Sequence, residues 1–279
     1  MSAYEEIVKK RVDRLREDYS MGNYCGRSLF SIIEKIKLDD NKSINLFRLP
    51  FKENNVSGFV GYKNDQFVIF TNTSKNLGYE IFTLAHEIYH LLENEPIIKS
   101  EVALNESEEN RDLSDDIADM FAAELLMPKD SFNADFNRLM SEDNLQVPDI
   151  KLIVELQHEY YVEYKAVTKR LRELNLIDSD LEYSLNEILK NEKEIKNITK
   201  KLGYSNELNE PSRAVHLPKR FLKAIEENYK NNKINYDDLT VVFGYCNLTP
   251  EDFGYEEDEL LSEGAKSLLE KLNKQLGSD

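Results

Sequence analysis

The chain contains few of the residues from which cysteine-based frameworks are built. Its 279 residues include two cysteines, four histidines and no tryptophan. Cys25 and Cys246 lie far apart in the sequence, which excludes a disulfide framework and a cysteine-based zinc motif. We therefore expect two reduced thiols, and a chain of this length can bury a core without covalent cross-links.

Long apolar runs are also lacking. The first twenty residues are charged throughout and contain no apolar core of a secretory signal peptide. No run approaches the ~18 apolar residues that a membrane-spanning helix needs. These features predict a soluble cytoplasmic protein without membrane contact.

Positive charge is in the minority. The chain has 36 lysines and arginines against 53 aspartates and glutamates, a net charge of -17 that is spread over both halves. A field of this sign repels nucleic acid and attracts basic partners. Solubility is the simplest interpretation of this charge, and a basic protein partner is the alternative.

The hydrophobic pattern predicts strands near the N-terminus of the chain. After helical spacing in the first forty residues, runs rich in valine, isoleucine and phenylalanine cover 44–51, 56–62 and 66–71. The turn-forming residues Lys63-Asn64-Asp65 separate the last two runs and predict a hairpin. We expect three short antiparallel strands.

Helical periodicity resumes at 77–92 and at 113–126, and from there the chain is predicted to be all helical. Two helices are expected within 150–177, broken around Tyr160-Tyr161, and one long apolar stripe covers 181–202. The polar segment 204–218 is the best candidate for a linker.

The predicted fold class is α+β: a domain with a small antiparallel sheet, followed by helical regions. The expected divisions are 1–130 for the domain that contains the sheet, 131–203 for a region with a helix-turn-helix-like pair and a long helix, and 204–279 for a C-terminal helical region.

Two of the four histidines lie within His86-Glu87-Ile88-Tyr89-His90, on the predicted helix 77–92. This is the H-E-x-x-H pattern of metal-dependent peptidases. Residues four apart share one helical face, so both imidazoles can bind one ion, and Glu87 can reach a water molecule beside it. The alternative is a pair of structural histidines on a half-buried helix.

A site with two histidines needs a third protein ligand and an open position for water. The helix predicted at 113–126 supplies acids, with Asp115 and Asp119 one turn apart beside an apolar stripe. We expect Asp115 to be the ligand, whereas Asp116 fits a solvated face or the negative charge favoured in a first helical turn. Small alanines on the stripe, Ala118, Ala122 and Ala123, permit close packing on the H-E-x-x-H helix.

These motifs resemble the ImmA/IrrE-type zinc metallo-endopeptidases. The resemblance rests on H-E-I-Y-H followed by D-x-x-A-D-x-F-A-A-E-L-L-M-P, and on Ile69-Phe70-Thr71-Asn72 and Phe82-Thr83-Leu84-Ala85 before the first histidine. It covers roughly 56–128. Two departures are an aspartate at 115, where the family usually has glutamate, and a tyrosine at 89, where a glycine is frequent.

The resemblance implies that 1–130 is a zincin-like metallopeptidase domain. It also implies a Zn²⁺ ion, with Mn²⁺ as the alternative, held by His86, His90 and Asp115. It further implies that Glu87 is the general base of peptide hydrolysis and that Asp119 orients a zinc histidine. A side-chain donor should also stabilise the oxyanion. His158, His216 and several tyrosines are the candidates for that donor.

Three functions compete. The first is a zinc endopeptidase that cleaves a regulatory protein, which the resemblance implies to be a helix-turn-helix repressor or antitoxin. The second is a toxin or regulatory subunit of a toxin–antitoxin pair that keeps the zinc fold with little proteolysis. The third is DNA binding through the segment 153–177, which carries Lys165, Lys169, Arg170 and Arg172; the net charge disfavours it.

Overall fold

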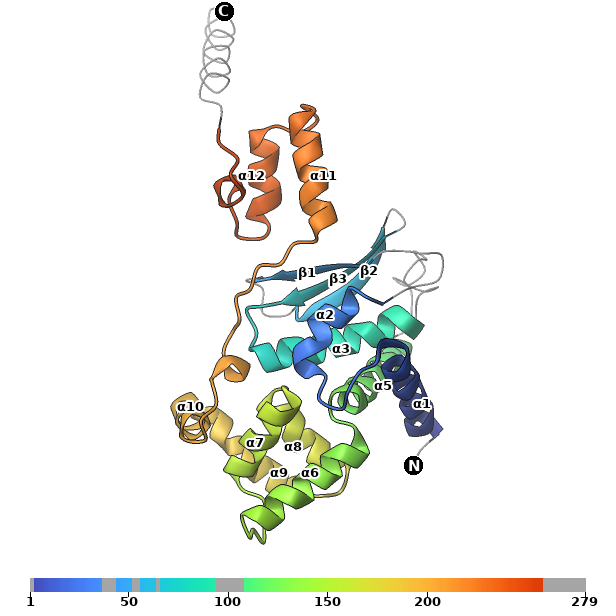
Figure 1. The fold of residues 1–279 in the computed structure, drawn as a ribbon, viewed down its shortest axis with the longest axis vertical. Coiled ribbons are helices and arrows are strands. Elements are labelled where there is room, and N and C mark those ends of the chain that lie inside the picture. Colours follow the sequence, from blue (N-terminus) through green and yellow to red (C-terminus); the bar gives the residue numbers. More distant parts are fainter. Residues whose placement is uncertain (1–2, 37–43, 52–55, 64–65, 94–107, 258–279) are drawn as a thin grey trace, which may run out of the picture. The chain divides into compact units, whose positions relative to one another are not determined.

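The computed structural model describes residues 3–36, 44–51, 56–63, 66–93 and 108–257. The chain divides into two compact units, Met1–Leu217 and Pro218–Asp279, and each is described by itself. The first unit contains a sheet with helices packed on it (Figure 1). The expected α+β class is confirmed.

The sheet has three strands in the order β1-β3-β2. Strand β2 (Gly58–Lys63) pairs antiparallel with β3 (Gln66–Asn72), as the predicted hairpin requires. Strand β1 (Ile44–Leu49), however, pairs parallel with the other edge of β3, so the expectation of an all-antiparallel sheet was wrong. The largely buried β3 takes the central position and leaves β1 the edge opposite β2. Hydrophobic alternation predicts strands but carries no information on their order.

Helices pack around this sheet. Helix α3 (Leu77–Glu93) contacts β2 and β3, and α5 (Glu108–Leu126) packs on α3. Helix α1 (Ala3–Tyr19) packs in turn on α5, while the short α2 (Leu29–Ile33), preceded by the 3₁₀ turn η1 (Gly26–Ser28), contacts α3 (Figure 1). Helix α3 is therefore enclosed between the sheet and other helices.

The position of α3 follows from its sequence. Asn76 begins the helix, because its side chain accepts a hydrogen bond from the backbone N–H of Tyr79 at 2.8 Å. One face is completely buried and consists of Ile81, Leu84, Ala85, Ile88 and Leu91. At Gly78 a Cβ atom would lie 2.5 Å from the backbone nitrogen of Glu163, so only glycine permits this close approach.

The middle helices share the core of the sheet domain. They are α6 (Lys129–Glu142), α7 (Ile150–Tyr160) and α8 (Tyr164–Glu173). The break expected at Tyr160-Tyr161 is confirmed, with Tyr161 in the left-handed conformation at φ 59°.

The long helix expected over 181–202 is interrupted. The chain forms α9 (Ser179–Asn186), the 3₁₀ turn η4 (Glu187–Lys190) and α10 (Glu192–Lys201). The Asn191 side chain accepts a hydrogen bond from the backbone N–H of Glu194 and so begins a new helix inside the apolar stripe. Gly203 follows α10 at φ 85°, as expected of a glycine that ends a helix.

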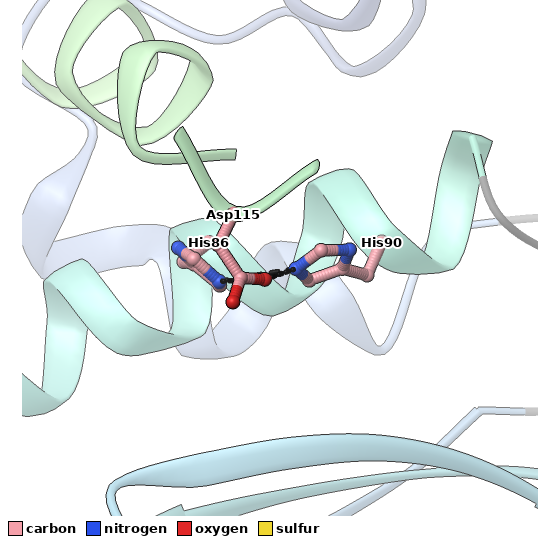
Figure 2. Close-up of side chains that lie close together, drawn as sticks. All are labelled: His86, His90 and Asp115. Atoms are coloured by element: carbon pink, nitrogen blue, oxygen red, sulfur yellow. Dashed lines mark hydrogen bonds and ion pairs between the residues drawn. The ribbon is translucent and has the colours of Figure 1, made fainter. Parts of the chain in front are cut away.

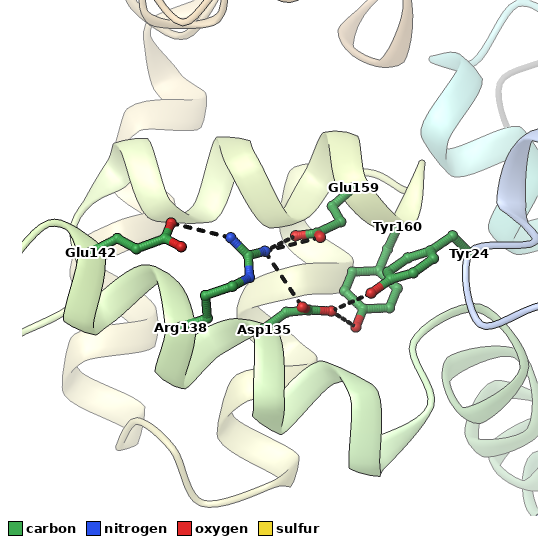
Figure 3. Close-up of polar contacts among 6 residues, drawn as sticks. All are labelled: Tyr24, Asp135, Arg138, Glu142, Glu159 and Tyr160. Carbon is green, nitrogen blue, oxygen red and sulfur yellow. Dashed lines mark hydrogen bonds and ion pairs between the residues drawn. The ribbon is translucent and has the colours of Figure 1, made fainter.

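A buried carboxylate joins α6 and α7 to the segment before η1 (Figure 3). Asp135 accepts hydrogen bonds from the hydroxyls of Tyr160 at 2.6 Å and Tyr24 at 2.9 Å. Arg138 contacts the same carboxylate and also pairs with Glu159 at 3.0 Å. A buried acid with several partners of this kind fixes the mutual positions of the segments that supply them.

The segment expected to be a linker is bound to the first unit. Residues 204–217, which include the 3₁₀ turn η5 (Glu207–Asn209), form isolated β-bridges from His216 to Arg48 and from Pro211 to Asn76. We call this segment the strap. Its polar composition resembles that of a linker, but the backbone of Glu210, Arg213 and His216 forms hydrogen bonds with the sheet domain.

The second unit is a small helical unit. It contains α11 (Lys219–Lys230), α12 (Tyr236–Gly244) and the 3₁₀ turn η6 (Pro250–Phe253), which begins with a capping box at Thr249. Phe243 stacks on Phe253 with ring centroids 4.6 Å apart. The end of the expected C-terminal helical region, from residue 258 onward, lies outside the described residues. Among those that are described, no helix is long and apolar enough to span a membrane.

Candidate metal centre and active site

Both histidines of the H-E-x-x-H pattern lie on α3, and their rings turn toward a common point beside Asp115 (Figure 2). The Nε2 atoms of His86 and His90 are 3.0 Å apart. Their side chains are mostly buried, with exposed fractions of 20% and 15%. The spacing of four residues has the effect expected from the sequence, because it brings two imidazole nitrogens to one point.

Helix α5 brings Asp115 to the same point (Figure 2). Its Oδ1 atom lies 3.2 Å from Nε2 of His90 and 3.8 Å from Nε2 of His86. Ligands at ~2.1 Å from a tetrahedral zinc ion are roughly 3.4 Å apart, so these separations suit a shared ion. Two imidazole nitrogens and one carboxylate oxygen are also a donor set that zinc accepts, and the three residues fit the ion that the resemblance implies.

Asp119 lies one turn further along α5 and contacts the other nitrogen of His86. Its Oδ1 atom is 3.0 Å from Nδ1 of His86, and its Oδ2 accepts a hydrogen bond from Nζ of Lys169 at 3.0 Å. Burial raises the pKa of Asp119, but its bonds to His86 and Lys169 outweigh this and hold the pKa below its usual value. An ionised Asp119 favours a proton on Nδ1 of His86, which leaves Nε2 free as a ligand.

Glu87 is almost fully buried beside the histidines, with 8% of its surface exposed. Burial raises the pKa of its carboxyl group to about 7. Gly58 at the start of β2 packs against this part of α3: a Cβ atom there would lie 2.6 Å from Cγ2 of Thr83, and at an ordinary contact distance of 3.6 Å from Cγ of Glu87. A carboxylate with a pKa near neutrality suits a general base.

A cavity of about 450 Å³ opens beside these residues. Its walls come from the start of β2, from α3, from α5 and from the N-terminal half of α8. His86, Glu87 and Asp119 line it, together with Tyr79, Lys165 and other residues that were not expected there from the sequence: Ser57, Gly58, Phe82, Thr83, Glu163, Ala166 and Lys169. In the sequence, Lys165 and Lys169 were candidates for DNA contact, and the structure places both at this cavity instead.

The model of the IrrE N-terminal-like domain of the M78 peptidases matches residues 39–172. This region belongs to the ImmA/IrrE-type family. The match contains all the residues of the candidate site and includes α8. The family is a peptidase family, in agreement with the resemblance seen in the motifs.

A transcriptional regulator of Mycobacterium tuberculosis is among the solved structures similar to this chain, with a TM-score of 0.40 and 18% sequence identity. The similarity covers 60% of this chain and 46% of the regulator, so the chain spans less than half of that protein's length. No curated protein matches the sequence.

The histidines considered as oxyanion donors lie away from the cavity of the IrrE-like domain. His158 stacks on Tyr204 with ring centroids 4.3 Å apart, and Nε2 of His216 lies 3.6 Å from Glu34. Neither residue lines the cavity, and Tyr79 is the tyrosine that does so among the described residues. Its hydroxyl lies 3.0 Å from that of Ser57.

The IrrE-like domain accommodates its two departures from the family pattern. The ring of Tyr89 packs against Phe121 of α5, with centroids 5.6 Å apart. Asp115 reaches both histidines from a helix whose Ala118 and Ala122 are fully buried. Asp116 is exposed, as expected for an acid of the solvated face.

The basic residues of α8 are largely engaged in contacts with other residues of this chain. Arg170 is buried, donates to the carbonyl of Met127 and pairs with Glu124. Arg172 pairs with Glu182, and Lys169 with Asp119 as described above. Three of the four cations that suggested DNA contact therefore bond to groups of this chain.

Proposed function

We propose that this protein is a zinc-dependent endopeptidase that hydrolyses a peptide bond in a regulatory protein. The observation that carries the proposal is the convergence of His86, His90 and Asp115 on one point, with the buried Glu87 beside them at a cavity. The match to a peptidase family over the same residues supports it.

The three converging residues would hold the ion. A bound zinc supplies a Lewis acid that polarises the scissile carbonyl and makes water acidic enough to attack at neutral pH. Glu87 takes a proton from the attacking water and passes it to the leaving amine, and its buried carboxyl with a pKa of about 7 suits both transfers. Asp119 and Lys169 hold His86 in the orientation and tautomer that a ligand needs.

We further propose a helix-turn-helix repressor or antitoxin as the substrate. The net charge of -17 supports a basic partner, because an acidic protein attracts a chain that carries the positive surface needed to bind DNA. Among the described residues, most cations of α8 already pair with acids of this chain and are not free to contact a duplex. We therefore propose that the partner, and not this chain, binds DNA.

Glu87→Gln is the variant that tests catalysis. It should retain about one metal ion per chain and lose hydrolysis by ~10²–10⁴-fold, since an amide cannot accept the proton of water. Metal content is measured on the purified protein, and cleavage on a library of peptides by mass spectrometry. Glu192→Gln, at an exposed glutamate of α10, is the matched control and should cleave normally. Undiminished cleavage by Glu87→Gln would overturn the mechanism.

His86→Ala and His90→Ala test the metal centre, because each removes one of three converging donors. Both should lose the ion. Full metal content in both variants would place the metal elsewhere.

A regulatory subunit that keeps the fold but cleaves little is the second candidate. Asp115 favours it, because its side chain is 62% exposed and is one methylene shorter than glutamate. If Asp115 supports full activity, Asp115→Glu should overfill the site and bind zinc no better, whereas Asp115→Ala should bind clearly worse. A gain of both metal affinity and cleavage in Asp115→Glu would mark the native site as weakened and favour the regulatory subunit. Asp116→Asn serves as the control.

A further inference from the structure

Helix α8 contributes a basic wall to the cavity of the candidate active site. Lys165 and Lys169 are four residues apart and therefore share one face of the helix. Both line the cavity that His86 and Glu87 also line, and the small Ala166 lies between them in the lining. This basic wall, Lys165 and Lys169, belongs to a protein that is strongly acidic as a whole.

The two ammonium groups differ in their surroundings. Lys169 donates to Oδ2 of Asp119, so part of its charge is already balanced. Lys165 is exposed. Glu163 lines the same cavity, and burial raises the pKa of its carboxyl group above its usual value, outweighing the positive charges of Lys165 and Lys169, which lower that pKa. Lys165 is therefore the group on this wall that can bind an anion.

We propose that Lys165, assisted by Lys169, binds the carboxylate of an aspartate or glutamate side chain near the scissile bond of the substrate. The proposal rests on the proposed peptidase function and names the substrate class. Lysine ammonium groups bind carboxylates through charge-assisted hydrogen bonds, which are stronger than neutral ones. The anionic groups of a peptide are its acidic side chains and its C-terminal carboxylate. An endopeptidase cleaves bonds inside a chain, away from the C-terminus, so the anion that reaches the cavity is an acidic side chain.

The charge of the whole molecule makes this subsite selective. The negative field attracts a basic partner, whereas the basic wall favours an acidic residue at one position of the bound segment. The substrate class that satisfies both is a basic protein with an acidic residue close to the cleaved bond.

Cleavage of peptides with amidated C-termini is the first test. Among the cleaved sites of a random library, aspartate and glutamate should be enriched at one fixed position relative to the cleaved bond. In matched peptides that differ only there, glutamate should give roughly tenfold higher kcat/KM than glutamine, the usual effect of a hydrogen bond to a charged group. A glutamine peptide with a free C-terminus has a terminal carboxylate but no acidic side chain at the tested position. If the wall binds side chains, this peptide should be cleaved no faster than its amidated form.

Charge reversal of the enzyme is the second test. A third matched peptide carries lysine at the same position. Lys165→Glu should reverse the preference, so that kcat/KM becomes higher for the lysine peptide than for the glutamate peptide. Lys165→Met should abolish the preference. Lys151→Glu makes the same change in net charge at an exposed position of α7 and should keep the wild-type preference. Equal losses for all peptides in Lys165→Glu would overturn the proposal, as would cleavage by the wild type without any charge preference.

A binding experiment tests the basic wall independently of the proposed peptidase function. Immobilised Glu87→Gln protein should retain acidic peptides from the same amidated library, and the Glu87→Gln, Lys165→Glu double variant should not. If the wild type cleaves no peptide, the peptidase function fails, but selective retention would still support the basic wall. Equal retention by the two proteins would overturn it.

Discussion

Individual residues of the site act through one another. His86 contacts Asp119 on one nitrogen and faces His90 and Asp115 with the other, and Lys169 holds the far oxygen of Asp119. A ligand histidine is oriented by the hydrogen bond of its second nitrogen, so the acid behind it affects metal affinity without touching the metal.

Asp119→Asn should weaken metal binding ~10–100-fold and leave the fold intact, since it removes the anion that fixes the His86 tautomer. Competition with a chelating dye measures the affinity. Asp116→Asn, at an exposed acid of the same helix, should match the wild type. Equal affinities in the two variants would show that Asp119 is only a surface acid.

Among the secondary-structure elements, β2 and α3 approach closely at Gly58, next to Glu87. In Gly58→Ala the added methyl group would meet the side chain of Thr83 at 2.6 Å and the carbonyl of Phe70 at 2.8 Å. Overpacking of this kind costs about 1–3 kcal/mol, and it should also lower cleavage because Glu87 lies beside the clash. Urea unfolding and peptide cleavage are the measurements. Gly61→Ala, on the same strand with no atom near the new methyl group, should change neither.

The contact of α7 with the strap makes stability depend on pH. Burial lowers the pKa of His158, which stacks on Tyr204, to about 4, against ~6.5 in an unfolded chain. The folded protein thus binds this proton less tightly than the unfolded chain, and stability should fall as the pH drops from about 6.5 toward 4. His158→Phe keeps a ring for stacking and should show a smaller fall. Parallel urea titrations between pH 7 and 4.5 measure the difference, and identical slopes would contradict it.

Across the whole first unit, the strap links segments of the sheet and of α3. Glu80 of α3 is 1% exposed and accepts hydrogen bonds from Arg48 of β1, from Thr71 of β3 and from Ser212 of the strap. Four segments far apart in the sequence therefore meet at one buried carboxylate.

Glu80→Gln should destabilise the protein by about 3–5 kcal/mol, because it leaves the guanidinium of Arg48 without its counter-charge. The free energy of unfolding in urea is the measurement. Glu34→Gln removes the exposed partner of His216 and should change stability by less than ~1 kcal/mol. A small effect of Glu80→Gln would mean that water or another group compensates Arg48.

Features that depend on local periodicity were predictable from the amino-acid sequence. The helix that presents His86 and His90 on one face, the acidic helix with Asp115 and Asp119, and the β2–β3 hairpin were all predictable. The reason is that a repeat of 3.6 or 2 residues, with its caps and turns, is set by neighbouring residues.

Only the tertiary structure decided which of these segments meet. It placed β1 parallel to β3, bound the strap to the sheet, and turned Lys165 and Lys169 of α8 toward the cavity of His86 and Glu87. It also broke the apolar stripe at Asn191, where a side-chain cap competes with helix continuation. Contacts of this kind depend on how the whole core is buried, and burial sums over residues that lie far apart in the chain.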